Sequence, residues 1–303
     1  MKDSIRLNNK KKDPLEDISD LIEFLDSKFK SYMIAGGFVR DWYQDKSFND
    51  IDIYIFDVPS DVVVQNLSKN FEIIRRGSHF IEAIFCENSL YTRGRPKYRV
   101  QFILWYPYLA KVVNSYDFEH CRFFIPIFSE EKEAVLVSHL ESKTPYAASQ
   151  EAINALESKE LILSSHALKQ LEYLRSEDSF SLITLEMFVK RSRKFVGRDF
   201  TLVKHTKRTL IESVERVFTD VLSFNLTTTS PAIFKSILLE DGDYIETRAT
   251  ETSAYSNLDI SKNIIKELLL LLDSDEKSTL LFSPSRLVRE TVEEALRQQS
   301  ALP

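Results

Sequence analysis

Glycine is scarce in this sequence, with six residues among 303. A glycine-rich loop that cradles phosphates needs several glycines at fixed spacing, and neither Gly-x-x-x-x-Gly-Lys nor Gly-x-Gly-x-x-Gly can be written anywhere in the chain. The sequence therefore gives no support to a P-loop, protein-kinase or Rossmann interpretation.

Cysteine is scarcer still, because only Cys86 and Cys121 occur. Two cysteines are too few for a disulfide framework and fit a reducing compartment. A zinc site through His79, Cys86, His120 and Cys121 is not expected, since no Cys-x-x-Cys spacing is present. His120 and Cys121 are neighbours on an expected strand and would point to opposite faces, so we expect core packing there and no nucleophilic pair.

Long apolar runs and strong net charge are also missing. The longest wholly apolar run, Leu268–Leu272, is far too short to cross a bilayer, and the N-terminus begins with charge and has no apolar leader segment. We therefore expect a soluble, non-secreted, cytoplasmic protein. The formal net charge of −6 argues against a chain coated for indiscriminate nucleic-acid binding, although local clusters can differ from the sum.

The hydrophobic content of 43% allows a sizeable core, and its periodicity predicts the elements. Strands are expected where apolar residues alternate or form short runs, and helices where they recur three and four residues apart. Strands are predicted over 32–35, 49–56, 71–75, 80–86 and 98–105, and helices over 15–25, 38–43 and 61–70. This order predicts an α+β fold with a mixed sheet and flanking helices.

From about Pro145 the pattern changes to leucine at helical spacing, as in Leu168, Leu171 and Leu174. The threonine-rich stretch Asn225–Pro231 reads as a linker, and Ser283-Pro284 as the start of a last helix. We predict a head followed by a mainly helical region, with domains at 1–145, 146–224 and 225–303.

One group of residues has the composition and spacing of a catalytic site. Two glycines open the stretch Gly36–Asp41 at a predicted strand end, and after eight further residues Asp50 and Asp52 follow on another strand. Glycines permit close backbone approach to a triphosphate, amide donors open the next helix, and Arg40 adds positive charge. Two carboxylates one residue apart on a strand face the same side and can hold one or two Mg²⁺ ions. The pattern therefore predicts nucleotidyl transfer.

The pattern Gly36-Gly37-x-Val39-Arg40-Asp41 with Asp50-x-Asp52 resembles the signature of the bacterial poly(A) polymerase and CCA-adding tRNA nucleotidyltransferase head. The stretches Val100–Ile103, Tyr116–Cys121 and Arg191–Val196 are similar to a less-characterised branch of this superfamily, common in phages and mobile elements. The resemblance covers roughly residues 30 to 200. It implies a nucleotidyltransferase (polymerase beta-like) head and metal-dependent transfer of a nucleoside monophosphate.

The resemblance also implies roles for single residues. Asp50 and Asp52 would be the catalytic residues and the ligands of Mg²⁺ or Mn²⁺, while the nucleotide would be bound by Gly36, Gly37, Arg40, Asp41 and Asp117. The relatives' third carboxylate matches Gln101, which cannot ligate as an anion. Asp117 either replaces it or holds the ribose or base, and the relatives' Arg-Arg-Asp base-reading motif is not recognisable.

The stretch Lys190–Arg208 carries eight lysines and arginines against one aspartate, Asp199. It either tracks a phosphate backbone or forms a solvated helix face. The RNA-binding interpretation rests on Arg191, Arg193, Lys194 and Arg198. The interleaved Phe188, Phe195 and Phe200 either stack on bases or pack the helical core.

Our leading hypothesis is a nucleotidyltransferase that adds a nucleoside monophosphate from a triphosphate, ATP foremost, to an RNA 3′ end, with tRNA among the acceptors. Two alternatives stay open. The acceptor is a protein hydroxyl or a small molecule, as in toxin-like members of the superfamily, or the head is a retired nucleotide- or RNA-binding adaptor. Gln101 motivates the second alternative.

Overall fold

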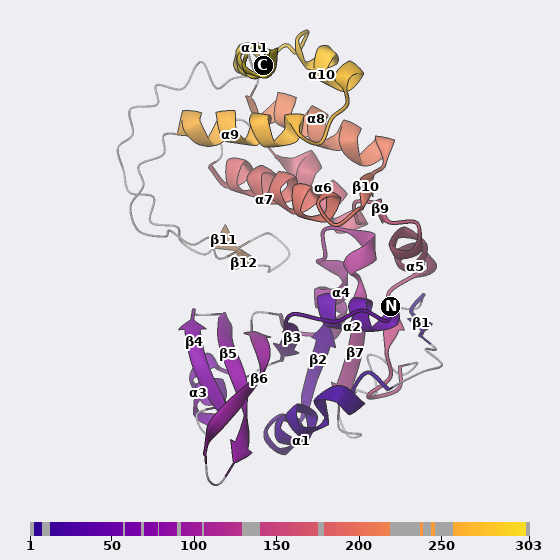
Figure 1. Cartoon of the computed structure of the whole chain (residues 1–303), viewed down its shortest axis with the longest axis vertical. Coiled ribbons are helices and arrows are strands. Elements are labelled where there is room, and N and C mark those ends of the chain that lie inside the picture. Colours follow the sequence, from indigo (N-terminus) through magenta and orange to yellow (C-terminus); the bar gives the residue numbers. More distant parts are fainter. Residues whose placement is uncertain are drawn as a thin grey trace. The chain divides into compact units, whose positions relative to one another are not determined.

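The structure is a computed structural model of the chain (Figure 1). It describes residues 3–7, 13–56, 58–67, 70–77, 79–89, 92–104, 106–128, 140–174, 179–218, 237–238, 244–245 and 257–300. The chain divides into two compact units: Leu239–Tyr244 groups with Met1–Leu156 in the first, and Glu157–Leu238 and Ile245–Pro303 form the second. The predicted boundaries after residues 145 and 224 stay predictions, and the linker predicted over 225–231 lies outside the described residues.

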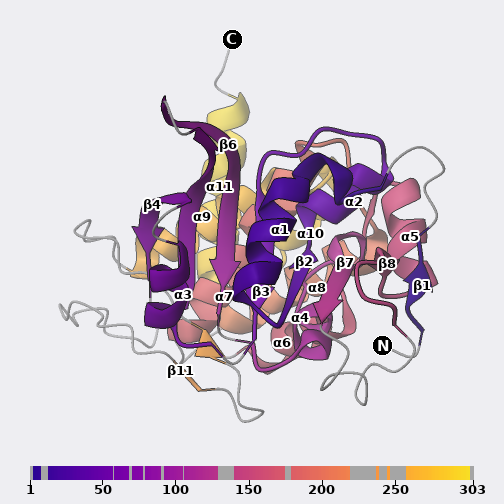
Figure 2. The ribbon, with the colours of Figure 1, turned by 90° about the horizontal axis from the view of Figure 1, so that it is seen from below.

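The first unit, which we call the head, is built on one mixed sheet in the strand order β1-β8-β7-β2-β3-β6-β5-β4 (Figures 1 and 2). Neighbouring strands run antiparallel except β3 and β6, which are parallel. The strands are Ile5–Arg6 (β1), Ser31–Ala35 (β2), Ile51–Ile55 (β3), Phe71–Arg76 (β4), Phe80–Ser89 (β5), Thr92–Ile103 (β6), Phe123–Phe128 (β7) and Tyr146–Ala147 (β8).

Short helices connect these strands, as expected where a parallel pair requires a crossover. Helix α2 packs against β2, β3 and β7, and α4 packs against β2 and β7. The helices of the head are the 3-10 helix η1 (Glu16–Ile18), α1 (Ser19–Lys28), α2 (Gly37–Tyr43), α3 (Ser60–Leu67), α4 (Leu109–Asn114), the 3-10 helix η2 (Glu119–Cys121) and α5 (Gln150–Glu157).

Strand β3 is buried on both faces below its acidic start. Ile51, Ile53 and Ile55 are at most 1% exposed. On the opposite face, Tyr54 and Phe56 pack in one cluster with Leu109, Val112 and Val113 of α4. This division into two faces is the one that the two-residue period predicts for 49–56. It leaves the carboxylates of Asp50 and Asp52 as the polar beginning of an otherwise apolar strand.

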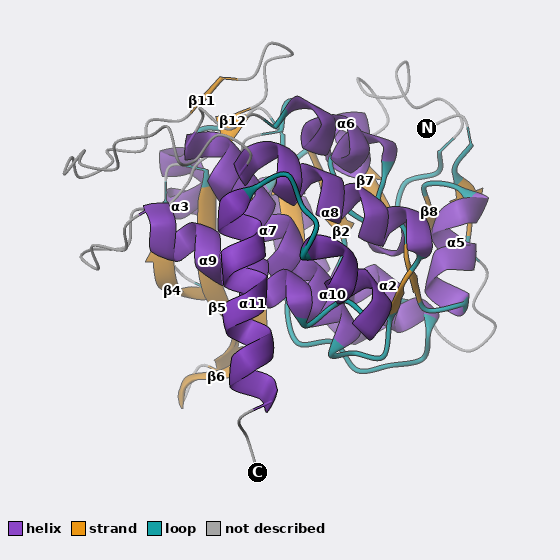
Figure 3. Ribbon diagram, turned by 90° about the horizontal axis from the view of Figure 1, so that it is seen from above, coloured by secondary structure: helices purple, strands orange, loops and turns teal. Residues whose placement is uncertain are grey.

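The second unit is mainly helical (Figure 3). Helix α9 packs against both α7 and α11, and α8 against α6 and α7. Two very short strands, β9 and β10, pair in parallel. The elements are Glu160–Leu161 (β9), Ser165–Tyr173 (α6), Ser179–Val196 (α7), Thr201–Leu202 (β10), Lys204–Phe218 (α8), Ile237–Leu238 (β11), Tyr244–Ile245 (β12), Asn257–Leu269 (α9), Ser274–Leu280 (α10) and Arg286–Ser300 (α11).

The predicted fold class is confirmed: the head is α+β with a mixed sheet and flanking helices, and helices follow. Strand β7 was not predicted, although it borders β2 in the middle of the sheet. Within the described part of the chain, no helix combines the length and apolar character needed to span a membrane.

Candidate nucleotide-binding site

Gly36 forms the turn between β2 and α2, and its backbone requires glycine. Its φ of 77° and ψ of −129° lie in a region that side chains disfavour. Its amide donates to the Phe123 carbonyl at 2.9 Å, which fixes the turn against β7. A Cβ atom at Gly36 would lie 3.2 Å from both the Asp52 carboxylate Oδ2 and the Tyr116 hydroxyl. The turn and the acidic strand therefore converge on one point.

The register of the sheet explains this convergence. Ala35, the last residue of β2, pairs with Asp52 of β3, so the residue after Ala35 must lie beside Asp52. Asp50 and Asp52 are both half-buried, while Ile51 between them is fully buried on the other face. The two carboxylates that the sequence places on one face thus open beside the glycine turn.

Tyr116 is a site residue that the sequence reasoning missed. Its hydroxyl lies 3.0 Å from the Tyr54 hydroxyl and close to Asp52. Burial, the Tyr54 hydroxyl and the nearby Asp52 charge raise the pKa of Tyr116 well above its ordinary value. A tyrosine that stays protonated beside a carboxylate can donate a hydrogen bond. The available signal was its place directly before Asp117.

Arg40 is buried, with 7% of its surface exposed. Its Nε and Nη2 atoms lie 2.8 and 2.7 Å from the Asp41 carboxylate Oδ1. Arg40 and Asp41, two of the residues predicted to bind nucleotide, therefore form an ion pair with each other within α2. Contact between Arg40 and a phosphate stays a prediction.

The interpretation of His120 and Cys121 rested on a strand, and that premise is wrong. They lie in η2, and His120 Nε2 is 3.4 Å from Cys121 Sγ. His120 is fully buried, and burial together with the nearby Arg40 charge lowers the pKa of His120 to about 3. A neutral, buried imidazole packs in the core, as expected, and does not serve as a base near neutral pH.

Gln101 lies beside Asp52, because β6 pairs in parallel with β3 at that position. Asp117 lies in a bend between α4 and η2, and not on a strand beside β3. Among the residues that the structure describes, no group of three or more His, Cys, Asp or Glu side chains could hold one ion. Mg²⁺ commonly binds through one or two carboxylates, with water and substrate phosphates completing its shell, so the aspartate pair fits such an ion.

Three of the four cations predicted to bind RNA lie on α7, and Arg198 follows two residues after the end of that helix. Arg191, Arg193, Lys194 and Arg198 are exposed, whereas Phe188, Phe195 and Phe200 are buried to 8% exposure or less. The phenylalanines therefore pack the core of the unit, and Phe195 meets Phe200 edge to face.

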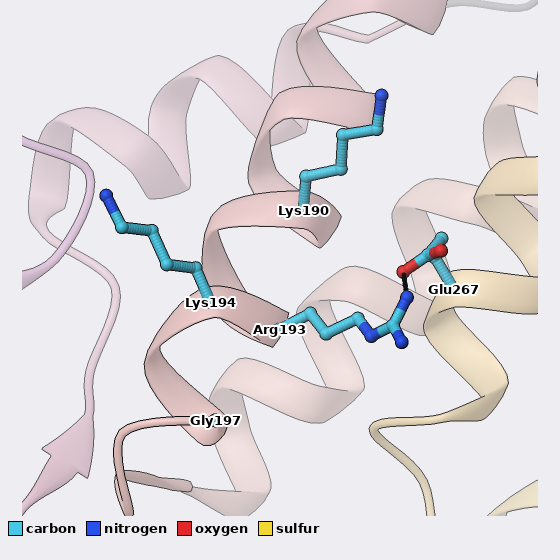
Figure 4. Close-up of a pocket in the computed structure, with 5 residues that line it drawn as sticks. All are labelled: Lys190, Arg193, Lys194, Gly197 and Glu267. Carbon is cyan, nitrogen blue, oxygen red and sulfur yellow. Dashed lines mark hydrogen bonds and ion pairs between the residues drawn. The ribbon is translucent and has the colours of Figure 1, made fainter.

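A shallow hollow of about 430 Å³ in the second unit is lined by Lys190, Arg193, Lys194, Gly197 and Glu267 (Figure 4). The Arg193 guanidinium points to Glu267 of α9 and forms an ion pair with it, while Lys190 and Lys194 point away from that pair. Lys190 is 2.7 Å from Glu186 on its own helix. Two of the three cations at the hollow, Lys190 and Arg193, therefore have an acidic partner.

The head thus combines a mixed sheet, a glycine turn after β2 and an aspartate pair at the start of β3. Residues 6–159, about half of the chain, match the model of the Gabija anti-defense 2 family. The chain belongs to the Gabija anti-defense 2 family.

Solved structures with a similar arrangement include the Thermotoga maritima CCA-adding enzyme complexed with tRNA, at a TM-score of 0.48 and 14% identity over 94% of this chain and 55% of that one. A CCA-adding enzyme with CTP gives 0.49 and 14% over 94% and 56%, and a tRNA-processing enzyme in apo form I gives 0.44 and 13% over 98% and 81%. The chain spans about half the length of the first two. No curated protein sequence matches it.

Proposed function

We propose that the head transfers a nucleoside monophosphate from a nucleotide triphosphate, ATP foremost, to an acceptor hydroxyl, with pyrophosphate as the leaving group, and that the acceptor is an RNA 3′ end. The observation that carries this proposal is the position of the Asp52 carboxylate beside the Gly36 turn. Its Oδ2 atom lies 3.2 Å from the place that a Cβ atom of residue 36 would occupy. A side-chain-free turn beside an acidic pair suits a metal-bound polyphosphate.

In this proposal each residue has a defined task. Asp50 and Asp52 hold Mg²⁺ or Mn²⁺, which when bound neutralises phosphate charge and favours ionisation of the acceptor hydroxyl. Gly36 and Gly37 let the phosphates approach the backbone, and the Tyr116 hydroxyl orients the Asp52 carboxylate. The roles of Arg40 and Asp41 at the phosphates and of Asp117 at the ribose or base are part of the same proposal.

The direct test is incorporation of each labelled nucleotide into total RNA in the presence of Mg²⁺. The variant Asp50→Ala/Asp52→Ala should reduce incorporation to the level without enzyme. Asp61→Ala is the matched control, since Asp61 is an exposed head carboxylate that pairs with Arg76 on β4. Equal incorporation by wild type and the double variant would refute the proposed site.

A retired head is the second candidate, and Gln101 is the observation that favours it. The neutral amide lies in register with Asp52, where a third carboxylate would strengthen the metal site. Calorimetry would then show ATP binding without turnover on any acceptor. Turnover that Asp52→Asn abolishes would remove this candidate.

Family membership suggests what the activity serves. We propose that nucleotidyl transfer counteracts Gabija defence, with a protein or small-molecule acceptor as the alternative to RNA. Infection of cells that carry a Gabija system should succeed when the wild-type chain is expressed and fail with Asp50→Ala/Asp52→Ala. Intact-mass measurement of the defence proteins identifies a protein acceptor if RNA stays unmodified.

A further inference from the structure

A row of paired residues crosses the head sheet on the face that carries the acidic pair. Asp52 of β3 pairs with Gln101 of β6, Gln101 with Glu82 of β5, and Glu82 with Arg75 of β4. Paired residues of adjacent strands point to the same face. The row therefore continues the Asp52 face for three strands, on the side of β3 away from the Gly36 turn, because β2 lies on the other side.

Glu82 is the centre of a charged cluster in this row. It is only 4% exposed, and two arginines hold it. Arg99 donates from Nε to Glu82 Oε1 at 2.8 Å and also from Nη2, and Arg75 Nε lies 3.4 Å from Oε2. The side chains of Arg75 and Arg99 are themselves 56% and 57% exposed. We call these three residues the arginine clamp.

The clamp has one positive charge in excess, since two guanidinium groups share one carboxylate. A guanidinium has five N–H donors in a planar fork that matches phosphate oxygens. Arg99 directs two of its donating atoms to Glu82, so the rest of its fork is available to a ligand from solvent. The buried Glu82 fixes both arginines, which leaves little flexibility to be lost on binding.

The clamp borders the acidic pair directly. Arg99 precedes Val100, whose partner on β3 is Ile51, and Asp50 precedes Ile51. The pKa of Arg99 is raised chiefly by its hydrogen bond to Glu82 and additionally by the Asp50 charge. Gln101, between Asp52 and Glu82, presents an amide that does not repel an anion.

We propose that the arginine clamp binds a backbone phosphate of the acceptor, which makes the acceptor a nucleic-acid 3′ end. This inference rests on the proposed function. The triphosphate occupies the Gly36 side of β3, and the acceptor crosses β6 and β5 on the other side, where Arg99 and Arg75 hold its phosphate and Gln101 lies beneath the terminal ribose. A protein hydroxyl brings no phosphate to the clamp.

The test compares Arg99→Gln and Arg75→Gln with Arg76→Gln. Arg76 follows Arg75 on β4 but pairs with Ile81 on the other face, where it bonds to Asp61 of α3, so it is the matched control. Binding of a short RNA with a free 3′ hydroxyl is measured by fluorescence anisotropy at several salt concentrations, and binding of ATP with Mg²⁺ by calorimetry. Each clamp variant should weaken RNA binding roughly tenfold and reduce the salt slope by about 0.7, while ATP binding stays unchanged.

Loss of an arginine leaves the buried Glu82 carboxylate short of one partner, which can destabilise the head. The double variant Glu82→Gln/Arg99→Gln removes both charges and therefore avoids an unpaired buried carboxylate. It should reproduce the loss of RNA binding with normal ATP binding. The proposed role of the clamp is overturned if folded Arg99→Gln binds RNA as tightly as Arg76→Gln does. It is also overturned if the protein nucleotidylates another protein and the clamp variants keep that activity. Failure of the proposed function itself is recognised separately, because ATP and Mg²⁺ would then bind equally to wild type and Asp50→Ala/Asp52→Ala.

Discussion

At the scale of single residues, Gly36 decides whether the turn after β2 can form. A side chain there would adopt an unfavourable φ of 77° and press on the Asp52 carboxylate and the Tyr116 hydroxyl. We predict that Gly36→Ala lowers the free energy of unfolding by about 2 kcal/mol and abolishes nucleotidyl transfer. Denaturant unfolding and the incorporation assay measure the two effects.

Gly37 is the control for this prediction. It is the first residue of α2, and a Cβ atom there would meet only the Arg40 side chain, at an ordinary 3.8 Å. Gly37→Ala should change stability by less than about 1 kcal/mol in either direction. If both alanine variants destabilise the head equally, the effect belongs to the glycine pair in general and not to the conformation of Gly36.

At the scale of elements, Lys194 of α7 and Arg198 just after this helix are exposed, while Phe188 and Phe195 of the same helix are buried. We predict that Lys194→Gln/Arg198→Gln reduces RNA affinity and makes the salt dependence shallower by about 1.4, or about 0.7 for each lost phosphate contact. The control is Lys204→Gln/Arg208→Gln on α8, because Arg208 is already paired with Glu212 at 2.7 Å. Fluorescence anisotropy titrations over a range of salt concentrations measure the RNA affinity of both double variants. Equal losses of affinity would contradict a specific role of Lys194 and Arg198.

The elements also show where prediction from sequence ends. The two-residue period places Asp50 and Asp52 together correctly, since it depends only on local geometry. The same period puts Arg75 on the face of Ile73, but an irregularity between these residues moves Arg75 opposite Glu82. Tyr116 likewise reaches Asp52 through a bend that no local pattern indicates. The α+β class follows from periodicity, whereas these contacts depend on long-range register.

At the scale of the whole molecule, His120 makes the fold acid-sensitive. Its pKa is lowered from about 6.5 to about 3, so the unfolded chain binds one more proton than the folded chain between these values. Stability should therefore rise with pH over this window and be lost as pH falls. Relative to His120→Gln, the free energy of unfolding of the wild type should fall by up to about 1.4 kcal/mol for each pH unit below 6.

Denaturant unfolding at a series of pH values from 7 to 4 measures this difference. Glu119 titrates with the opposite sign, because burial raises its pKa and its stability contribution is lost as pH rises. It is present in both proteins, so the difference between them isolates His120. Parallel pH profiles for wild type and variant would contradict the assignment.

The irregularity in β4 has a consequence for how this chain tolerates length changes. Ile74 is the residue without a partner in the ladder between Ile73 and Arg75, and its side chain is 50% exposed. Shortening the strand by this one residue would keep Arg75 across from Glu82, whereas one more residue inserted after it would swap the faces of Arg75 and Arg76. Because residues 75 and 76 are both arginines, such a swap would leave one cation on each face of the strand, so the sheet surface would keep its charge when the strand changes in length by one residue.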